Sequence, residues 1–525
     1  MRKHLSLFLV LLGLFFFISC SSSNSSNDSD MISDEDIDLQ DPETQDDDSD
    51  SQDSEIVGDY DEKPDHDEDA DSESNDTDSD IEDPEEPDDE IFEETEPING
   101  YERCYDKIPA GDYEGFFADK KIEPLIKKIL GYDGDYELKE EDLEKITEIG
   151  VSAKDLRGFE KLVNLEYVKF QDTEGNIYDF TPLSNLKKLK KIRIYFRPPA
   201  ELDPSEHHEN MTCLDGSFSL LTTLEALEME NTHLKEVAPI EQLVNLVSLN
   251  LNFNKIEILP ENIGNLEKLD FLVFVHNNVK NIEQLKSLTN LKELFFHYNY
   301  VEDIYPIKNL VDLTRLGAQG NRIKNISAVT SLVKLTYLGL DNNQIEEIPK
   351  EITNLKKLKT LELDYNNICN LPDLKGLDSL DEMRLSNNEL NDEDWMKLDG
   401  LEHVWSLSVA LNKITKVPIM KNLKSLKELY LNYNYITDLS GFADNESFPA
   451  LRRLDVGSNN IDNAEAFRNR KGLTSLWVDK NCIKDFSPLE ELKARGTYVG
   501  GMNEQLESCE RKIITSVEGV CPFEE

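Results

Sequence analysis

Apolar residues recur along most of the chain in a frame of about 22 positions. In the copy that begins at Leu246, the apolar positions are Leu249, Leu251, Ile256 and Leu259, and polar residues alternate with the first two of them. This alternation predicts a short strand with one face turned inward. The frame begins at fifteen positions, which are 146, 165, 189, 224, 246, 269, 291, 313, 335, 358, 380, 404, 426, 451 and 473. The long step from 189 to 224 holds an insert, residues 197–220.

The ninth position of the frame is an asparagine in most copies. An amide carries donors and an acceptor, so a stack of asparagines satisfies the backbone groups that are freed where each coil turns. We therefore expect a structural asparagine ladder, which consists of Asn254, Asn277, Asn299, Asn321, Asn343, Asn366, Asn388, Asn412, Asn434, Asn459 and Asn481. Other residues stand at this position in the first copies, namely Lys154, Thr173 and Thr232.

One copy of the frame is too short to fold alone, because its few aliphatic side chains do not offset the entropy of ordering its backbone. Stability then comes from stacking of copies, with parallel strands on one side of the array. Local Pro, as in Leu259-Pro260 and Ile348-Pro349, favours short turns or single helical turns on the other side. We expect an α/β solenoid over residues 146–490, with an N-terminal cap at 98–145 and a C-terminal cap at 491–525.

The N-terminal cap is predicted to contain two helices. The first ends at Gly131, and its inward residues are Leu125, Ile126, Ile129 and Leu130. The second begins near Lys139, with Leu143 and Ile146 on its inner face. The pattern Phe-x-Asp-x-x-Ile followed by Glu-Glu-Asp-Leu-x-x-Ile-Thr, within residues 117–147, resembles the N-terminal flank of bacterial leucine-rich repeat proteins of the internalin type.

This resemblance extends over the repeats to about residue 490. It implies a leucine-rich repeat horseshoe with parallel strands on the concave face, and it suggests binding at a host or cell surface. The chain lacks an obvious immunoglobulin-like domain after the array and a wall-anchoring tail, which argues against an invasion role.

The N-terminus has the pattern of an export signal. Two basic residues precede a mostly apolar run, residues 5–18, which is shorter than the about 20 residues of a membrane span. Phe17-Ile18-Ser19-Cys20 resembles a bacterial lipobox, so we expect residues 1–19 to be a lipoprotein signal peptide and Cys20 to carry the lipid. Ser21 resembles the residue that permits export to an outer membrane. The alternative is an ordinary signal peptide whose cleavage discards Cys20.

Much of the formal net charge of −53 is concentrated in one segment, because residues 28–97 hold 36 Asp and Glu against one Lys. Such a composition has too little apolar surface to fold, so residues 20–97 are predicted to be an acidic disordered tether. Calcium binding there is the weaker interpretation, because no EF-hand-like loop is present. A polyanion of this kind repels phosphate backbones, which argues against nucleic acid as a partner.

On the strand face, the third, fifth, seventh and eighth positions of the frame point outward. Two adjacent copies place apolar and aromatic residues there, which are Phe271, Val273, Val275, His276, Phe295, His297 and Tyr298. An aromatic trail continues toward the C-terminus through Tyr337, Tyr365, Tyr430, Tyr433 and Trp477. An exposed apolar patch with a polar rim usually marks a partner site, so this cluster is the candidate binding surface. The alternative is that neighbouring rings simply pack on one another.

If Cys20 is lipidated, six cysteines remain for an oxidising compartment. The first candidate disulfide joins Cys509 and Cys521, the second joins Cys482 and Cys509, and Cys104 with Cys213 is a further possibility. A bond between Cys369 and Cys482 is excluded, because five copies separate them. Buried free thiols are the alternative for Cys369 and Cys482.

The sequence offers no nucleophile elbow and no phosphate-binding loop, so we expect no catalytic residues, no enzyme activity, no cofactor and no small-molecule substrate. His207 and His208 in the insert are interpreted as a polar surface loop, and no metal site is predicted. The expected protein is a membrane-anchored leucine-rich repeat lipoprotein of the cell envelope, at the outer membrane or cell surface, that recognises a protein on its concave face. The alternative is a structural or adhesive envelope protein that self-associates or binds matrix or glycan.

Overall fold

The computed structural model describes residues 92–94, 96–104, 107–171, 177, 179–195 and 213–509. The expected signal peptide with Cys20, most of the acidic tether, His207, His208 and Cys521 lie outside the described residues. Every described element belongs to one unit of the chain, Glu85–Glu525.

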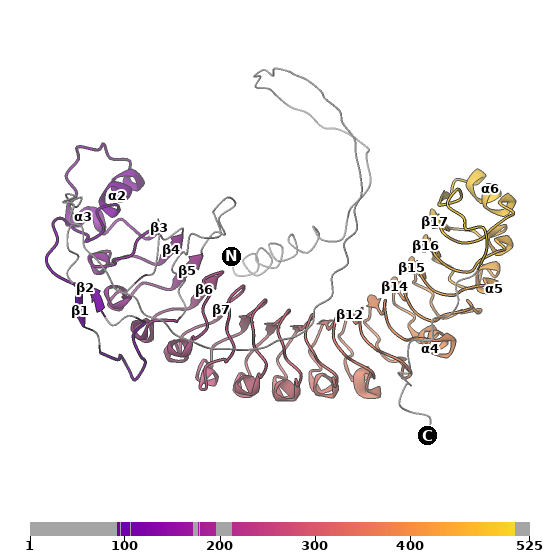
Figure 1. Cartoon of the computed structure of the whole chain (residues 1–525), viewed down its shortest axis with the longest axis horizontal. Coiled ribbons are helices and arrows are strands. Elements are labelled where there is room, and N and C mark those ends of the chain that lie inside the picture. The colour runs from indigo at the N-terminus through magenta and orange to yellow at the C-terminus, as the bar shows by residue number, and fades with distance from the viewer. Residues whose placement is uncertain are drawn as a thin grey trace, which may run out of the picture. The chain divides into compact units, whose positions relative to one another are not determined.

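Within this part of the chain, sixteen strands form one parallel sheet in strict chain order. They line the inner side of the array, and the helical turns lie on its outer side (Figure 1). The strands are β3 (Glu148–Val151), β4 (Tyr167–Gln171), β5 (Lys191–Tyr195), β6 (Ala226–Glu230), β7 (Ser248–Asn250), β8 (Phe271–Val273), β9 (Glu293–Phe295), β10 (Arg315–Gly317), β11 (Tyr337–Gly339), β12 (Thr360–Glu362), β13 (Glu382–Arg384), β14 (Ser406–Ser408), β15 (Glu428–Tyr430), β16 (Arg453–Asp455), β17 (Ser475–Trp477) and β18 (Tyr498–Gly500). The last of them lies in the segment assigned to a C-terminal cap, so the sheet extends one strand past the fifteen predicted copies.

Short helical turns connect the strands on the outer side, as the local prolines predicted. Most are 3-10 helices, and they comprise η2 (Phe159–Lys161), η3 (Thr181–Leu183), η4 (Gly216–Leu220), η5 (Ala238–Gln242), η6 (Ile263–Asn265), η7 (Glu283–Ser287), η8 (Tyr305–Asn309), η9 (Ser327–Ser331), η10 (Lys350–Asn354), η11 (Leu398–Gly400) and η12 (Glu465–Phe467). Three α-helices also occur in the array, which are α4 (Asp392–Lys397), α5 (Ser440–Ala443) and α6 (Ser487–Ala494).

The inward residues of the frame stack in register along the array. Leu249 pairs with Leu227 on one side and with Leu272 on the other, and all three are fully buried. The buried apolar side chains form one continuous cluster from Phe117 to Val499. Because each copy buries its leucines only against its neighbours, the array folds as a stack and not copy by copy.

The asparagines of the ninth position link consecutive copies. Asn343 donates from Nδ2 to the carbonyls of Ala318 and Leu340, each at 3.0 Å, and accepts at Oδ1 from the main-chain N–H of Ile323, at 3.0 Å. Asn254 begins the series by accepting from Thr232 and Leu234. The ladder therefore satisfies backbone groups that no strand pairing reaches.

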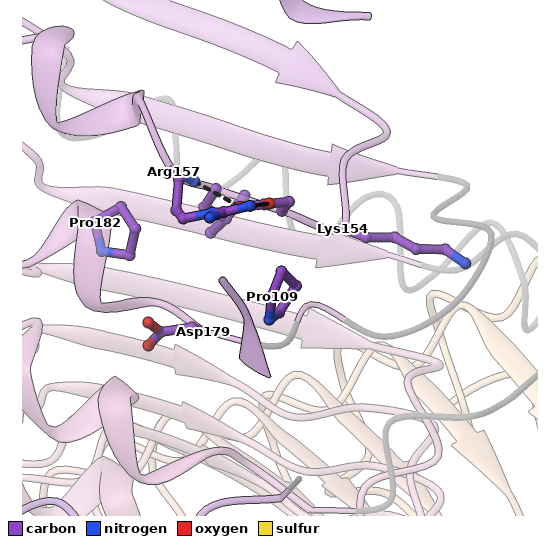
Figure 2. Close-up of a pocket in the computed structure, with 7 residues that line it drawn as sticks. Pro109, Lys154, Arg157, Asp179 and Pro182 are labelled. Carbon is purple, nitrogen blue, oxygen red and sulfur yellow. Dashed lines mark hydrogen bonds and ion pairs between the residues drawn. The ribbon is translucent and has the colours of Figure 1, made fainter. Parts of the chain in front are cut away.

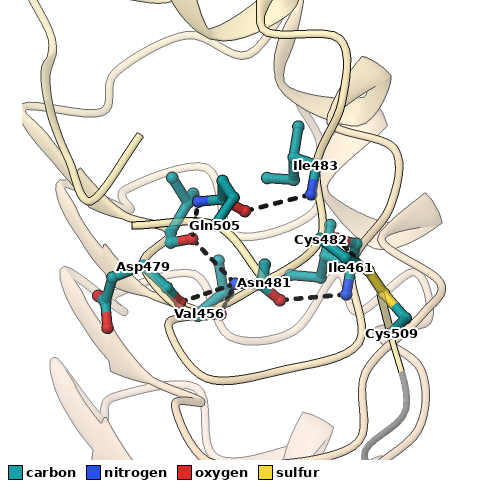
Figure 3. The surroundings of a disulfide bond; sticks show 9 residues. Val456, Ile461, Asp479, Asn481, Cys482, Ile483, Gln505 and Cys509 are labelled. Carbon is teal, nitrogen blue, oxygen red and sulfur yellow. Dashed lines mark hydrogen bonds between the residues drawn. A yellow bond between two sulfur atoms is a disulfide. The ribbon is translucent and has the colours of Figure 1, made fainter. Parts of the chain in front are cut away.

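Gln505 closes this ladder at the C-terminal end, which the sequence pattern did not reveal (Figure 3). Its Nε2 donates to the carbonyl of Val478 at 2.8 Å, and its Oε1 accepts from the N–H of Ile483 at 3.2 Å. These are the same two roles that Asn481 plays for the preceding copy, at Val456 and Ile461. The longer side chain of glutamine reaches the same groups from the position after the ninth.

The disulfides differ from the first prediction. Cys509 bonds to Cys482 and not to Cys521 (Figure 3), because the chain after β18 continues as a further coil beside residues 480–482 and brings the Cα atoms of Cys482 and Cys509 within 5.5 Å. Cys104 bonds to Cys213, with 5.9 Å between their Cα atoms. Cys369 is also disulfide-bonded, so neither Cys369 nor Cys482 is a free thiol.

The N-terminal cap contains α2 (Ile122–Leu130) and α3 (Glu140–Leu143), close to the predicted helices. Gly131 ends α2 in the left-handed conformation, with φ 71°, which glycine adopts at little steric cost. Ile122 and Ile126 are buried, whereas Ile129 is exposed and does not face the array as expected. Ile129 follows Ile122 by seven residues and lies on nearly the same side of the helix, but in its last turn, where its side chain stays uncovered.

Two short strands precede the helices of the cap. β1 (Phe92–Glu94) pairs antiparallel with β2 (Lys107–Pro109). Residues 92–94 were assigned to the disordered tether, and that boundary is wrong. The physical reason is that backbone pairing with β2 supplies the hydrogen bonds that the acidic composition alone does not favour.

Residues 98–104 form a strap that crosses onto the repeats. Tyr101 donates to Glu241 at 2.6 Å, and the guanidinium of Arg103 lies 2.9 Å from Asp215 and 3.0 Å from Asp179. Gly216 is required at the crossing, because a Cβ there would lie 2.7 Å from the carbonyl oxygen of Tyr101. The Cys104–Cys213 disulfide and these ion pairs hold the strap against the array.

Candidate functional site

The concave face carries the outward side chains of the strands and of the positions that follow them. In the row of third positions, Phe271 of β8 pairs in register with Glu293 of β9. In the row of fifth positions, Val273 pairs with Phe295. Because parallel strands lie about 4.8 Å apart, side chains of one row in adjacent copies touch.

Three rings form an aromatic stack along the row of eighth positions. The ring of His276 lies between those of Phe253 and Tyr298, with centroid distances of 4.9 and 4.4 Å and interplanar angles of 17° and 8°. All three side chains are exposed. The stack therefore presents ring edges and end faces to solvent as one rigid ridge.

The backbone beneath this aromatic stack is left-handed. The φ angles of Phe253, His276 and Tyr298 are 56°, 54° and 53°. A non-glycine residue in this region costs about 1 to 2 kcal/mol, and bulky residues are uncommon there. Asn342 occupies the same conformation, with φ 54°, and Gly320 does so with φ 65°. Aromatic residues are thus placed where Asn or Gly meets the backbone requirement at lower cost.

Phe271 and Phe295 lie beside the stack, with ring centroids 6.3 Å apart. Arg315 joins this pair to the next copies, because its guanidinium lies 5.6 Å from the ring of Phe295 and 5.2 Å from the ring of Tyr337. These cation–π contacts make the surface continuous from β8 to β11.

Val273 and Val275 do not contribute exposed surface, contrary to the prediction. Their side chains are only 7% and 8% exposed. Both point toward the concave face, but a valine is short beside the larger side chains that occupy neighbouring positions of the same rows. They support the aromatic residues instead of meeting a partner.

Glycines in the next copies make room for His297. A Cβ at Gly317 would lie 2.2 Å from Cε1 of His297 and 2.7 Å from Cδ1 of Phe295, so only glycine permits these rings to lie over the strand. Burial lowers the pKa of His297 to about 3, and its Nδ1 accepts from the main-chain N–H of Gln319 at 3.2 Å. His297 is therefore a neutral part of the platform at physiological pH.

A carboxylate cluster follows immediately on β11 to β13. It comprises Asp341, Glu362, Asp364 and Glu382, together with the cation of Arg384. Tyr337 donates to Glu362 at 2.6 Å, and Gln319 donates to the Tyr337 hydroxyl at 2.8 Å. Arg384 lies 2.6 Å from Asp364 and 3.8 Å from Glu362.

The cluster is short of positive charge. Burial, together with the charges of Glu362 and Asp364, raises the pKa of Asp341 to about 8, while Arg384 opposes the shift. Burial and Glu362 also raise the pKa of Glu382. The concave face thus passes from an aromatic region to an acidic one within a few strands.

Asp341→Asn is expected to stabilise the protein at pH 8 and not at pH 4. The folded-state pKa of about 8 exceeds the ordinary value of 3.8, so the wild type loses stability as the pH rises through the window between them. The amide keeps an acceptor for the N–H of Asp364 and removes the titration. The free energy of unfolding of the variant, measured in urea at pH 4 and pH 8, should exceed that of wild type by on the order of 2 kcal/mol more at pH 8 than at pH 4. The exposed Asp133→Asn is the matched control, and equal pH responses of both variants would contradict the shift.

The remaining predicted aromatic residues do not join this surface. Tyr365 and Tyr433 are exposed in the row of eighth positions, three copies apart. Tyr430 lies in the row of fifth positions and donates to Glu428 at 3.0 Å, and Trp477 contacts Tyr498 with ring centroids 6.0 Å apart. Between Arg384 and Tyr430 the strand face carries only serines, Ser406 and Ser408 of β14, so the trail is interrupted.

Two hollows of the described surface differ in size and openness. One of about 50 Å³ lies between β2 and the first repeats, where Arg157 pairs with Asp155 at 2.6 Å (Figure 2). The other is an open groove of about 410 Å³ beside the aromatic stack, lined by His276, Tyr298, Tyr300 and several ladder asparagines. The first is too small for an organic ligand, and the second belongs to the candidate surface.

Within the described ranges, no group of three or more His, Cys, Asp or Glu side chains is placed to hold a metal ion. Among these same residues, no helix has the length and apolar character needed to span a membrane.

Several contributors to this surface were not among the predicted site residues, among them Arg315, Asp341 and Glu362. A signal for them existed in the sequence, because Gly317 and Gly339 stand at outward strand positions where other copies carry side chains. Such glycines indicate that neighbouring side chains lie across the strand. The contacts of Arg315 with rings on both sides could not be read from spacing.

The fold and its ladder are those of leucine-rich repeats. The sequence profile described as "Leucine-rich repeat region" matches residues 309–494, and the one described as "Leucine Rich Repeat" matches residues 245–266. These matches and the parallel sheet show that the chain carries a leucine-rich repeat domain. Neither description names a catalytic activity.

Solved structures of leucine-rich repeat proteins share the fold. A leucine-rich repeat protein of Leptospira interrogans is 23% identical, with a TM-score of 0.56, and the match covers 69% of this chain and 97% of that one. The functional domain of InlJ from Listeria monocytogenes is 19% identical, with a TM-score of 0.51 and coverage of 70% and 82%. The plant peptide hormone receptor RGFR1, in complex with RGF2, is 19% identical, with a TM-score of 0.51 and coverage of 69% and 64%. No curated protein sequence matches the chain.

Proposed function

We propose that this chain is a lipid-anchored, extracytoplasmic protein of the bacterial cell envelope that binds a partner protein on its concave face. The observation that supports binding is the aromatic surface around Phe271, Phe295 and the stack of Phe253, His276 and Tyr298. Exposed, clustered rings on a left-handed backbone lower the stability of the fold. Such an arrangement is expected where the rings bind a partner.

The similar plant protein supports a protein or peptide as the class of ligand. It is described as a peptide hormone receptor in complex with RGF2. In this chain, the sheet presents a comparable long face whose specificity lies in the outward positions of each copy.

Export and anchoring rest on the sequence of the N-terminus. The lipobox-like Phe17-Ile18-Ser19-Cys20 supports lipid attachment at Cys20. The Cys104–Cys213 and Cys482–Cys509 disulfides support an oxidising compartment. Cys20→Ser is expected to release the protein from the membrane fraction. Membrane retention of this variant equal to that of wild type would contradict the anchor.

The binding function is tested by affinity capture from envelope extracts with the full chain, followed by reconstitution with the purified partner. The double variant Phe271→Ser/Phe295→Ser is expected to fold and to bind at least about 30-fold more weakly, because each ring acts as an anchor of the interface. Tyr305→Ser removes an exposed aromatic ring from the outer side, on η8, and should leave affinity unchanged. Equal affinity of all three proteins would overturn the proposal, and oligomers that form without a partner would favour a scaffold.

A further inference from the structure

The aromatic surface and the carboxylate cluster are adjacent parts of one face. Phe295 lies on β9, Tyr337 on β11 and Glu362 on β12, and Arg315 and Gln319 connect them through ring and hydrogen-bond contacts. β9 and β12 are separated by three strand spacings, or roughly 14 Å at about 4.8 Å per strand. A single extended segment of about four or five residues spans that distance, at roughly 3.3 Å per residue.

The charges of the cluster are unbalanced. Four carboxyl groups, on Asp341, Glu362, Asp364 and Glu382, surround one guanidinium, that of Arg384. Arg384 already pairs with Asp364, through a 2.8 Å hydrogen bond from Nε and a 2.6 Å contact from Nη2. The burial and mutual repulsion that raise the pKa of Asp341 and Glu382 agree with a cluster that lacks a counter-ion.

We propose that the partner presents a lysine or arginine side chain to Glu362 and Glu382 while an aromatic or aliphatic side chain, about four residues away in an extended segment, packs on Phe271 and Phe295. This inference rests on the proposed function and adds the chemistry of the partner. A cation supplies the missing charge, and a neighbouring apolar side chain covers the rings. The chain's own residues 28–97 have the wrong sign for this place, since they hold 36 acidic residues and one lysine.

The geometry also explains why the two regions are kept together. Charge at the acidic end steers a basic partner and fixes its register, whereas the rings supply most of the buried apolar area. Tyr337 stands at the junction, because it contacts Arg315 on the aromatic side and donates to Glu362 on the acidic side.

The test uses a random 12-residue peptide library selected on the full chain at physiological salt. Selected peptides are expected to combine Lys or Arg with an aromatic or aliphatic residue about four positions away. The variant Glu362→Gln/Glu382→Gln should bind them about tenfold or more weakly. The charge-matched control Glu346→Gln/Glu351→Gln, at exposed positions away from the concave face, should bind them like wild type.

The outcomes separate this inference from the proposed function. If Phe271→Ser/Phe295→Ser abolishes binding while Glu362→Gln/Glu382→Gln does not, the concave face binds a partner, but the proposal that this partner presents a basic residue is refuted. If neither variant changes binding, both proposals fail. Selection of neutral or acidic peptides overturns the inference. A concentration-dependent dimer that either variant disrupts also overturns it, because a second copy of the chain then occupies the concave face.

Discussion

Asn343→Ala is expected to lower the free energy of unfolding by about 3 to 5 kcal/mol, because the buried N–H of Ile323 loses its acceptor and two buried carbonyls each lose one of their two amide donors. Asn343 accepts from the N–H of Ile323 and donates to the carbonyls of Ala318 and Leu340, all at 3.0 Å. The side chain is buried, so water does not replace these bonds without opening the coil. The orphaned N–H costs about 1 to 3 kcal/mol, and each lost carbonyl hydrogen bond costs about 0.5 to 1.5 kcal/mol. The two carbonyls keep their other donors, Asn321 and Asn366.

The measurement is chemical unfolding together with hydrogen exchange. Because each copy contacts only its neighbours, the loss of protection should concentrate in the copies from 313 to 358 before it spreads. The matched control is Gln344→Ala, which truncates the exposed amide next in sequence and should change stability by less than about 0.5 kcal/mol. Similar unfolding midpoints for the two variants would contradict a stabilising ladder.

Arg103→Ala is expected to destabilise the protein by about 3 to 5 kcal/mol, because it leaves the buried carboxylate of Asp215 without the cation that balances its charge. Arg103 and Asp215 have side chains that are 8% and 2% exposed, and Nε lies 2.9 Å from the carboxylate. The variant also frees Asp179, which lies 3.0 Å from the same guanidinium. The strap of residues 98–104 should then be held by the Cys104–Cys213 disulfide and by the hydrogen bond from Tyr101 to Glu241.

This second prediction is checked by unfolding with and without a reducing agent. Arg322→Ala removes an exposed pair, 3.9 Å from Glu302, and should cost at most about 1 kcal/mol. In Arg103→Ala, reduction should release the strap and make its residues susceptible to proteolysis, whereas wild type should resist. If Arg103→Ala behaves like Arg322→Ala, the buried ion pairs do not hold the strap.

The repeating core follows from the sequence because the same apolar positions recur in every copy and pack against their counterparts in the neighbouring copies. The spacing of Leu246, Leu249 and Leu251 sets which side chains point inward, and the structure buries all three. The ninth-position asparagines are equally readable, because only an amide meets the donors and acceptors at that turn. Gln505 is the exception, since it performs the same role one position later and has no place in the frame.

The candidate surface is harder to predict from the sequence, because the outward positions of different copies do not share a common environment. Val273 and Phe295 both occupy fifth positions, yet the first is covered and the second is only half-buried. Which of them meets solvent depends on the size of the side chains in the neighbouring copies. The rings of Phe253, His276 and Tyr298 stack because the backbone at each residue is left-handed, which directs the three rings along one row.

The solenoid, its parallel strands, its inward leucines and the short turns of its outer side follow from the repeat of the sequence, because a fixed period specifies contacts between equivalent residues. Contacts between residues that the period does not relate emerge only when the chain is folded. These are the pairing of Cys482 with Cys509, the strap at Asp215, the charge-poor cluster around Asp341 and the burial of His297 over Gly317. Such contacts depend on how side chains of different size and charge share the space between neighbouring copies, and no repeat of the frame encodes that.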